Sequence, residues 1–202
     1  MARISAAQRR QDFVNAAVEV IATHGIDGAT TRRIAEQAGA NLAMVHYCYD
    51  SKEALFADVY KFVVGKFRVL SMEVGPQATV ADTARKILRD LMEYYVESPS
   101  FAIAALELIN WARRQHEDSG IELFDRALEG ARSALRAAAG DDAVDDETID
   151  EIASTIACVS DGFAVGWITY GDRALAAKQM KTAESLFDSW LAARLGSAAV
   201  AG

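Results

Sequence analysis

Apolar residues recur at helical spacing along almost all of this 202-residue chain, and this constrains its fold more than any other feature. In the first segment Phe13, Ala17 and Ile21 stand four residues apart, with Val14 and Val18 beside them. Hairpin signals between alternating runs are missing, because both Asp-Gly pairs lie in helical surroundings. The spacing predicts an all-α fold of about nine helices.

Glycine, proline and capping residues mark where these helices should end. Gly25 stops the first helix, Gly39-Ala40-Asn41 separates two short ones, and Pro99 divides two longer ones. After the first, we expect helices at 32–38, 42–48, 51–72, 79–96, 100–115, 119–140, 148–170 and 175–195. The acidic stretch from 141 to 151 is expected to be a solvated loop that favours a helix start, rather than a calcium site.

The composition excludes several classes of protein. A hydrophobic fraction of 51% is too high for a disordered chain, and two cysteines are too few for a disulfide scaffold. No uninterrupted apolar run approaches the roughly 18 residues of a membrane helix, and the first residues lack the apolar core of a secretory signal. We therefore expect a soluble, cytoplasmic chain with no membrane partner.

The charge is distributed unevenly. The net charge of -8 argues at first against nucleic acid. Residues 1–68, however, hold nine Lys and Arg against seven Asp and Glu, a net of +2, and the rest of the chain carries -10. A mildly basic head on an acidic body leaves DNA binding by the head open.

The segment from Thr30 to Lys52 has the pattern of a helix-turn-helix, two short helices joined by a glycine turn. The residues expected to face inward are Ile34, Ala35, Ala38, Val45 and Tyr49. Those expected to face base edges in the major groove are Leu42, Ala43, Met44, His46 and Tyr47. Leu42 and Met44 suit thymine methyl groups, while Thr31, Arg32, Tyr47 and Lys52 supply donors for phosphates.

Two stretches carry a resemblance to a known family. Thr30-Thr-Arg-Arg-Ile-Ala-Glu-Gln-Ala-Gly39-Ala-Asn41 and His46-Tyr-Cys-Tyr-Asp-Ser-Lys-Glu-Ala-Leu55 resemble the TetR/AcrR family of transcriptional regulators. The resemblance implies a DNA-binding domain at 8–68 and a ligand-binding and dimerisation domain at 69–196. It also implies a homodimer that binds a palindromic operator, is released by a small-molecule effector, acts as a repressor, and is not an enzyme.

By position, the resemblance assigns DNA contacts to eight residues: Thr31, Arg32, Leu42, Ala43, Met44, His46, Tyr47 and Lys52. The chain departs from the family pattern at His46, where Tyr is usual, at Cys48, where an aromatic residue or His is common, and at Leu42 and Met44, where polar or small residues are usual. These departures bear on which operator sequence is read, not on whether DNA is bound.

The effector site and dimer interface are expected in the second half of the chain. Asn110 and Arg114 place polar groups beside Trp111, and with Tyr95 and Phe101 they form the candidate ligand site; plain core packing is the alternative. Residues of the last two helices form the candidate dimer interface, namely Ile152, Ile156, Val159, Phe163, Phe187 and Leu191. A fully internal helix is the alternative there.

Signs of catalysis and cofactor chemistry are weak. The three histidines share no metal spacing with each other or with a cysteine, so we expect no metal and no cofactor. Cys48 and Cys158 are interpreted as buried or incidental thiols rather than redox switches. Two other functions remain open: a helical enzyme or carrier that ignores DNA, and a helix-turn-helix used for protein contacts.

Overall fold

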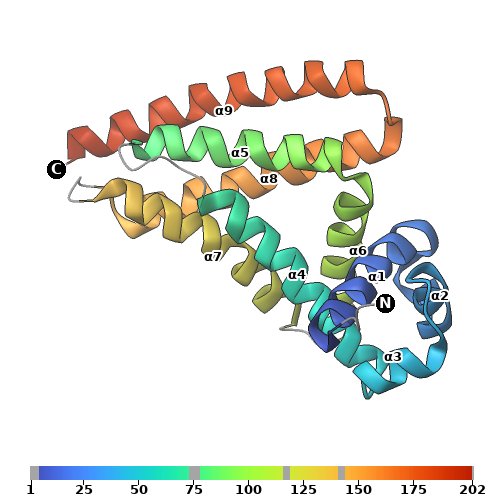
Figure 1. Ribbon diagram of the computed structural model, residues 1–202. Coiled ribbons are helices and arrows are strands. Elements are labelled where there is room, and N and C mark those ends of the chain that lie inside the picture. The colour runs from blue at the N-terminus through green and yellow to red at the C-terminus, as the bar shows by residue number, and fades with distance from the viewer. Residues whose placement is uncertain (1–4, 73–77, 116–118, 141–143, 202) are drawn as a thin grey trace. The chain divides into compact units, whose positions relative to one another are not determined.

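The computed structural model describes residues 5–72, 78–115, 119–140 and 144–201, and nine helices and no strands lie within them (Figure 1). The all-α prediction is therefore confirmed. The helices are α1 (Ala6–Gly28), α2 (Thr31–Gln37), α3 (Leu42–Cys48), α4 (Lys52–Met72), α5 (Val80–Glu97), α6 (Pro99–Gln115), α7 (Ser119–Ala139), α8 (Asp146–Tyr170) and α9 (Arg173–Ala201).

The chain divides into two compact units. The first comprises Met1–Gly65 with Pro99–Ile121, and the second comprises Lys66–Ser98 with Glu122–Gly202. Helix α6 thus belongs with α1, α2, α3 and the start of α4. The domain ranges 8–68 and 69–196 stay a prediction, because the contacts show which helices pack together and do not show which function each group has.

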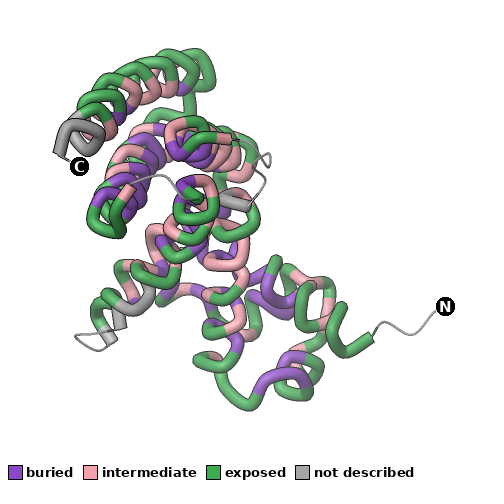
Figure 2. The backbone as a smooth tube through the Cα atoms, turned by 90° about the vertical axis from the view of Figure 1, so that its left-hand side faces the viewer, coloured by how far each residue is buried: buried purple, intermediate pink, exposed green. Residues whose placement is uncertain are grey.

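The first unit is built around α1. Its apolar stripe is buried, with Phe13, Ala17 and Ile21 each 0% exposed, and α1 packs against α6, α2 and α3. Figure 2 shows this buried stripe within the first unit. Gly25 interrupts the helix at φ +68°, as the sequence predicts, and a further turn then reaches Gly28.

In the second unit, α5, α8 and α9 lie side by side (Figure 1). Two ion pairs join α5 to α9 along the surface. The Nε atom of Arg85 lies 2.7 Å from Oδ1 of Asp188, and Nε of Arg89 lies 2.6 Å from Oε1 of Glu184. These pairs orient α9 over α5, whereas the apolar core supplies most of the stability.

The acidic stretch that precedes and opens α8 makes more hydrogen bonds and ion pairs than the predicted solvated loop would. Residues 141–143 of this stretch lie outside the described residues. Asp145 caps α8, because its carboxylate accepts a hydrogen bond from the backbone N–H of Thr148 at 2.8 Å. Asp146 pairs with Arg136 at 2.8 Å, and Asp150 pairs with Arg132 at 2.9 Å. Arginines of α7 therefore neutralise carboxylates of α8.

Helix α8 is long and apolar enough to cross a membrane by length and average hydropathy alone, and it is the only such helix in the described part of the chain. The average hydropathy of α8 is high enough for a membrane helix although polar residues interrupt its apolar runs. Its apolar side, including Ile149, Ile152 and Ile156, is buried against the neighbouring helices. A core helix of a water-soluble protein passes the same test.

Candidate nucleic-acid interface

The turn between α2 and α3 has the geometry of a glycine-terminated helix. Gly39 has φ +61°, its N–H donates to the carbonyl of Glu36 at 3.1 Å, and the N–H of Ala40 donates to the carbonyl of Ala35 at 2.9 Å. This pair of bonds satisfies carbonyls that the end of α2 leaves open, and it needs a left-handed residue. The turn therefore sets the direction in which α3 departs.

Helix α3 has seven residues, too few to be stable alone, and depends on its cap and its packing. Asn41 caps it, because its side-chain oxygen accepts the N–H of Met44 at 2.9 Å. Val45 and Cys48 are buried on its inner side, and Ile34 and Ala35 are buried on α2. Four of the five predicted inward residues, including Tyr49, are thus buried, and Ala38 is half-buried.

Arg10 of α1 holds the end of α3 in place, a role that the sequence reasoning missed. Its Nη2 and Nε atoms donate to the carbonyl of Cys48 at 2.7 and 3.2 Å. The same guanidinium lies 4.9 Å from the ring centroid of Tyr49, whose hydroxyl donates to the carbonyl of Arg10 at 3.5 Å. Burial also raises the pKa of Tyr49, so this phenol stays neutral.

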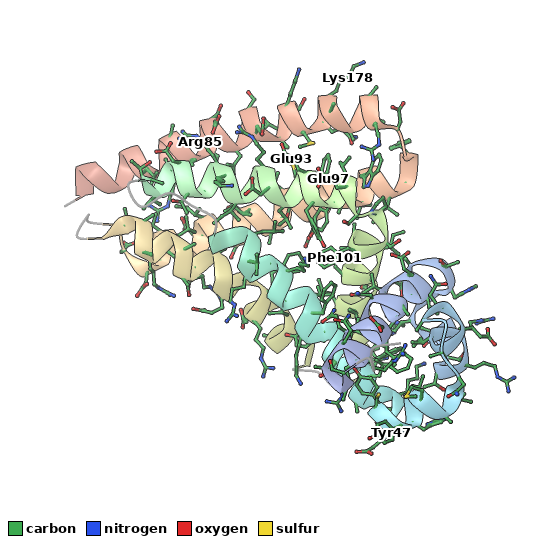
Figure 3. All side chains as sticks on the ribbon, viewed as in Figure 1. Tyr47, Arg85, Glu93, Glu97, Phe101 and Lys178 are labelled. Carbon is green, nitrogen blue, oxygen red and sulfur yellow. The ribbon has the colours of Figure 1, made fainter. Side chains whose placement is uncertain are left out.

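The outer side of α3 is exposed, as a recognition helix requires. Tyr47 is 82% exposed and points away from the unit's core (Figure 3), and Met44 is 37% exposed. Ala43 and His46 are also exposed. Leu42, which was also predicted to face outward, is half-buried.

The predicted phosphate donors differ in how free they are. Arg32 is exposed at the start of α2, and Thr31 is half-buried there. Lys52 is half-buried: its Nζ atom donates to the carbonyl of Ile26 at 3.5 Å and lies 4.9 Å from the centroid of Phe56. Lys52 therefore also braces the end of α1 from within the same unit.

We predict opposite stability changes for two glycines of this unit. Gly39→Ala should lower the free energy of unfolding by about 1–2 kcal/mol, because alanine resists a positive φ even where no atom crowds its Cβ. Gly65→Ala, in the interior of α4 with equally open space, should raise it by about 0.5–1 kcal/mol. Urea unfolding of both variants measures this, and equal changes would contradict the role given to the turn.

The predicted effector residues are divided between the two units. In the first unit, Phe101 is buried with its ring 6.3 Å from Phe62, and Trp111 packs edge-on against Phe56 at 5.9 Å. Asn110, bonded to the carbonyl of Leu106, and Arg114 are exposed. Tyr95 is buried in the second unit, so the ligand role of these five stays a prediction.

Tyr95 has a partner that the sequence reasoning did not single out. Its hydroxyl donates a hydrogen bond to the carboxylate of Asp161 on α8. Burial raises the pKa of Asp161 to about 6, although the bond from Tyr95 acts in the opposite direction. The ionised carboxylate is therefore held in the fold at a cost in stability.

That cost predicts a pH-dependent effect of Asp161→Asn. The folded-state pKa exceeds the usual value, so stability falls as pH rises from about 4 through about 6, and the cost is complete above that. The variant should gain up to about 3 kcal/mol at pH 8, and the gain should vanish near pH 4. Thermal unfolding of both proteins across this range measures it; a gain independent of pH would contradict the burial of a charge.

The predicted dimer residues are mostly buried within one chain. Ile152, Ile156, Phe163, Phe187 and Leu191 are at most 6% exposed, and only Val159 is half-buried. Beside them, α8 and α9 form an open groove of about 370 Å³. Its lining consists of Val159, Gly162, Phe163, Lys178, Gln179, Thr182, Ala183 and Leu186.

The described residues form helices, and a glycine turn presents the exposed face of the short helix α3. This arrangement defines a helix-turn-helix protein. Residues 13–59 match the family described as "Bacterial regulatory proteins, tetR family". The helix-turn-helix segment thus belongs to this TetR family of transcriptional regulators.

Two curated relatives are repressors. The chain is 31% identical over 113 residues to the HTH-type nicotine-responsive transcriptional repressor HdnoR of Paenarthrobacter nicotinovorans, which is 55% of this chain and 58% of that protein. It is 27% identical over 123 residues to the HTH-type transcriptional repressor NicS of Pseudomonas putida, which is 60% of this chain and 56% of that protein. The matched regions thus span less than two thirds of either relative.

Solved structures show that the fold extends over nearly the whole chain. A TetR transcription regulator from Haloarcula marismortui has a TM-score of 0.72 at 20% identity, covering 93% of this chain and 98% of that one. The regulator FadR from Bacillus subtilis, in complex with stearoyl-CoA, has a TM-score of 0.68 at 20% identity, covering 89% and 97%. At these identities the likeness concerns the fold alone.

Proposed function

We propose that this protein is a cytoplasmic, homodimeric repressor that binds a palindromic DNA operator and is released by a small-molecule effector. The observation that carries the proposal is the exposed outer face of α3, with Met44 and Tyr47 held outward by a capped and buried inner face. Such a face reads base edges when the helix enters the major groove. A regulatory role without catalysis agrees with the family and with its named relatives.

Three groups of residues make up the proposed interface with DNA. Met44, Tyr47 and their neighbours Leu42, Ala43 and His46 face the bases. Thr31 and Arg32 bind phosphate from the start of α2, where open backbone N–H groups also favour an anion. Lys52 binds phosphate at the start of α4 after exchanging its contact with the Ile26 carbonyl.

The proposed dimer forms through the outer sides of α8 and α9. Most of the six predicted interface residues are buried within one chain, so they form the core beneath this face. The face itself offers the groove, the exposed side chains of Val165 and Leu186, and a row of exposed small residues at Ser154, Cys158 and Gly162. Small residues let a partner helix approach closely, and a two-fold dimer matches a palindromic operator.

The effector is proposed to bind in the second unit and to change DNA affinity through α4, which runs from the first unit into the second. HdnoR is described as nicotine-responsive and the structural neighbour FadR was solved with stearoyl-CoA, so these names point to no single class of ligand. The effector of this chain must therefore be inferred from its own residues.

Selection from a library of random DNA duplexes tests the proposal. We expect a palindromic sequence whose half-sites lie about one helical turn apart, bound with an affinity that falls steeply as salt rises. If no common sequence is recovered at low salt, the proposal that this protein is a repressor is overturned. That result would favour a helical enzyme or carrier, or a helix-turn-helix that contacts protein.

A further inference from the structure

The short helix α3 ends in carbonyls that lack partners within the helix, as every α-helix does. The N–H of Tyr49 donates to the carbonyl of Val45 at 2.9 Å and completes the last helical hydrogen bond. The carbonyl of Cys48 is bonded from another helix, because Nη2 and Nε of Arg10 donate to it at 2.7 and 3.2 Å. Arg10 of α1 therefore caps the C-terminal end of α3.

The contact of Arg10 suits the chemistry of a helix end. A cation at the C-terminal end of a helix interacts favourably with the helix dipole, and a guanidinium offers several N–H donors in one fixed plane. The guanidinium carbon of Arg10 also lies 4.9 Å from the ring centroid of Tyr49, which follows α3 directly and is 3% exposed. Arg10 thus holds both the last carbonyl of α3 and the first residue after it.

Tyr47 lies in the turn of α3 that Arg10 closes. Its side chain is 82% exposed and points away from the core of the unit (Figure 3), so packing does not fix its position. A helix of seven residues frays at its ends unless they are held. Met44 lies near the other end of α3, where Asn41 caps the helix. The place of the Tyr47 ring therefore depends on the end that Arg10 holds.

We propose that Arg10 is a positioning residue that sets which DNA sequence the protein prefers, and that it acts through Tyr47 without contacting DNA. Arg10 keeps the last turn of α3 in the form that brings Tyr47 to the base edges. Its loss lowers the affinity for the operator and leaves the affinity for other DNA unchanged. This role rests on the proposed function, in which α3 reads the operator.

A direct contact of Arg10 with phosphate is the alternative, because the residue as a whole is exposed. The two roles differ in their salt dependence. Each lost phosphate contact lowers the slope of log affinity against log salt by about 0.9, and it weakens binding to every DNA sequence alike. A lost positioning contact leaves that slope unchanged and weakens only the preferred sequence.

The test uses the full chain, the selected operator and a scrambled duplex of the same length, with fluorescence anisotropy at several salt concentrations. Arg10→Met removes the guanidinium and keeps an unbranched stem. We expect it to lower operator affinity about tenfold, with the affinity for the scrambled duplex and the salt slope unchanged. Arg10→Lys keeps the charge without the planar pair of donors, so it should recover part of the discrimination. Arg10→Lys also carries the test if Arg10→Met does not fold.

A double-mutant cycle shows whether Arg10 acts through Tyr47. In the Tyr47→Ala background, Arg10→Met should lower operator affinity by less than about twofold, because residues that act as one unit are not additive. A general loss of stability would instead reduce operator affinity equally in both backgrounds. Thermal unfolding of the four proteins measures that stability separately.

Arg33→Met is the matched control. Nη1 of Arg33 donates to the carbonyl of Gly28 at 2.7 Å, so this variant removes a contact of the same kind from the end of α1. It should leave the ratio of operator affinity to scrambled-duplex affinity unchanged. An equal fall of that ratio in Arg33→Met and Arg10→Met would overturn the special role of the contact at α3.

The proposal is also overturned if Arg10→Met lowers the salt slope, or if its loss of operator affinity is as large in the Tyr47→Ala background. The outcomes separate this proposal from the proposed function. If the parent protein selects no operator, the repressor fails and the role of Arg10 fails with it. If the parent binds an operator and Arg10→Met discriminates as well as the parent, only the role of Arg10 fails.

Discussion

Tyr47→Ala should weaken operator binding by about 10- to 100-fold while leaving the fold intact. The side chain is 82% exposed on the outer face of α3, so its removal costs little packing, whereas a ring in the major groove contacts both base edges and phosphate. Fluorescence anisotropy on the selected operator gives the affinity, and thermal unfolding should show a melting temperature within about 1 °C of the parent.

A second substitution separates the two contributions of that side chain. Tyr47→Phe keeps the ring and removes only the hydroxyl, so it should lose less affinity than Tyr47→Ala. An operator affinity that is unchanged in Tyr47→Ala would remove α3 from the DNA interface.

Leu186→Arg should convert the protein into monomers and lower operator affinity by more than about 100-fold. Leu186 is 67% exposed at the edge of the groove between α8 and α9, and a two-fold interface would bring in the new charge twice. Burying two unpaired guanidinium groups opposes association, and a monomer has only one recognition helix. Sedimentation at micromolar concentration measures the oligomeric state, and anisotropy measures operator binding.

Ala177→Arg provides the matched control on the same helix. Ala177 lies nine positions before Leu186, so its side chain is on the opposite side of α9. Ala177 is also exposed. This variant should remain dimeric and bind the operator normally. If Leu186→Arg also remains a dimer, the interface lies on another surface of the second unit.

The helix-turn-helix could be predicted closely because its signals are local. The glycine at 39, the cap at Asn41 and the inward row of Ile34, Ala35 and Val45 act over a few residues, where spacing decides which side is buried. The supports of this motif could not be predicted. Arg10 reaches the carbonyl of Cys48 across 38 residues of sequence, and nothing in the pattern around either residue marks that contact.

The second half of the chain shows where sequence periodicity is ambiguous. The row of Ile152, Ile156 and Phe163 was interpreted as a dimer interface, and the structure buries these side chains within one chain. An apolar row has the same spacing whether it packs against its own chain or against a partner. The outer groove next to this row exists only because α9 packs beside α8, which the sequence pattern does not specify.

The sequence by itself determined the helices, the turn between α2 and α3 and the family, because helical spacing, caps and glycine turns are set by neighbouring residues. Only the tertiary structure decided which polar groups lost water. Asp161 and Tyr95 stand 66 positions apart, and the sequence marked Tyr95 only as a candidate ligand residue. The packing of α5 on α8 half-buries the carboxylate of Asp161 and raises its pKa to about 6. Burial depends on which helices meet, and that is a property of the packed chain.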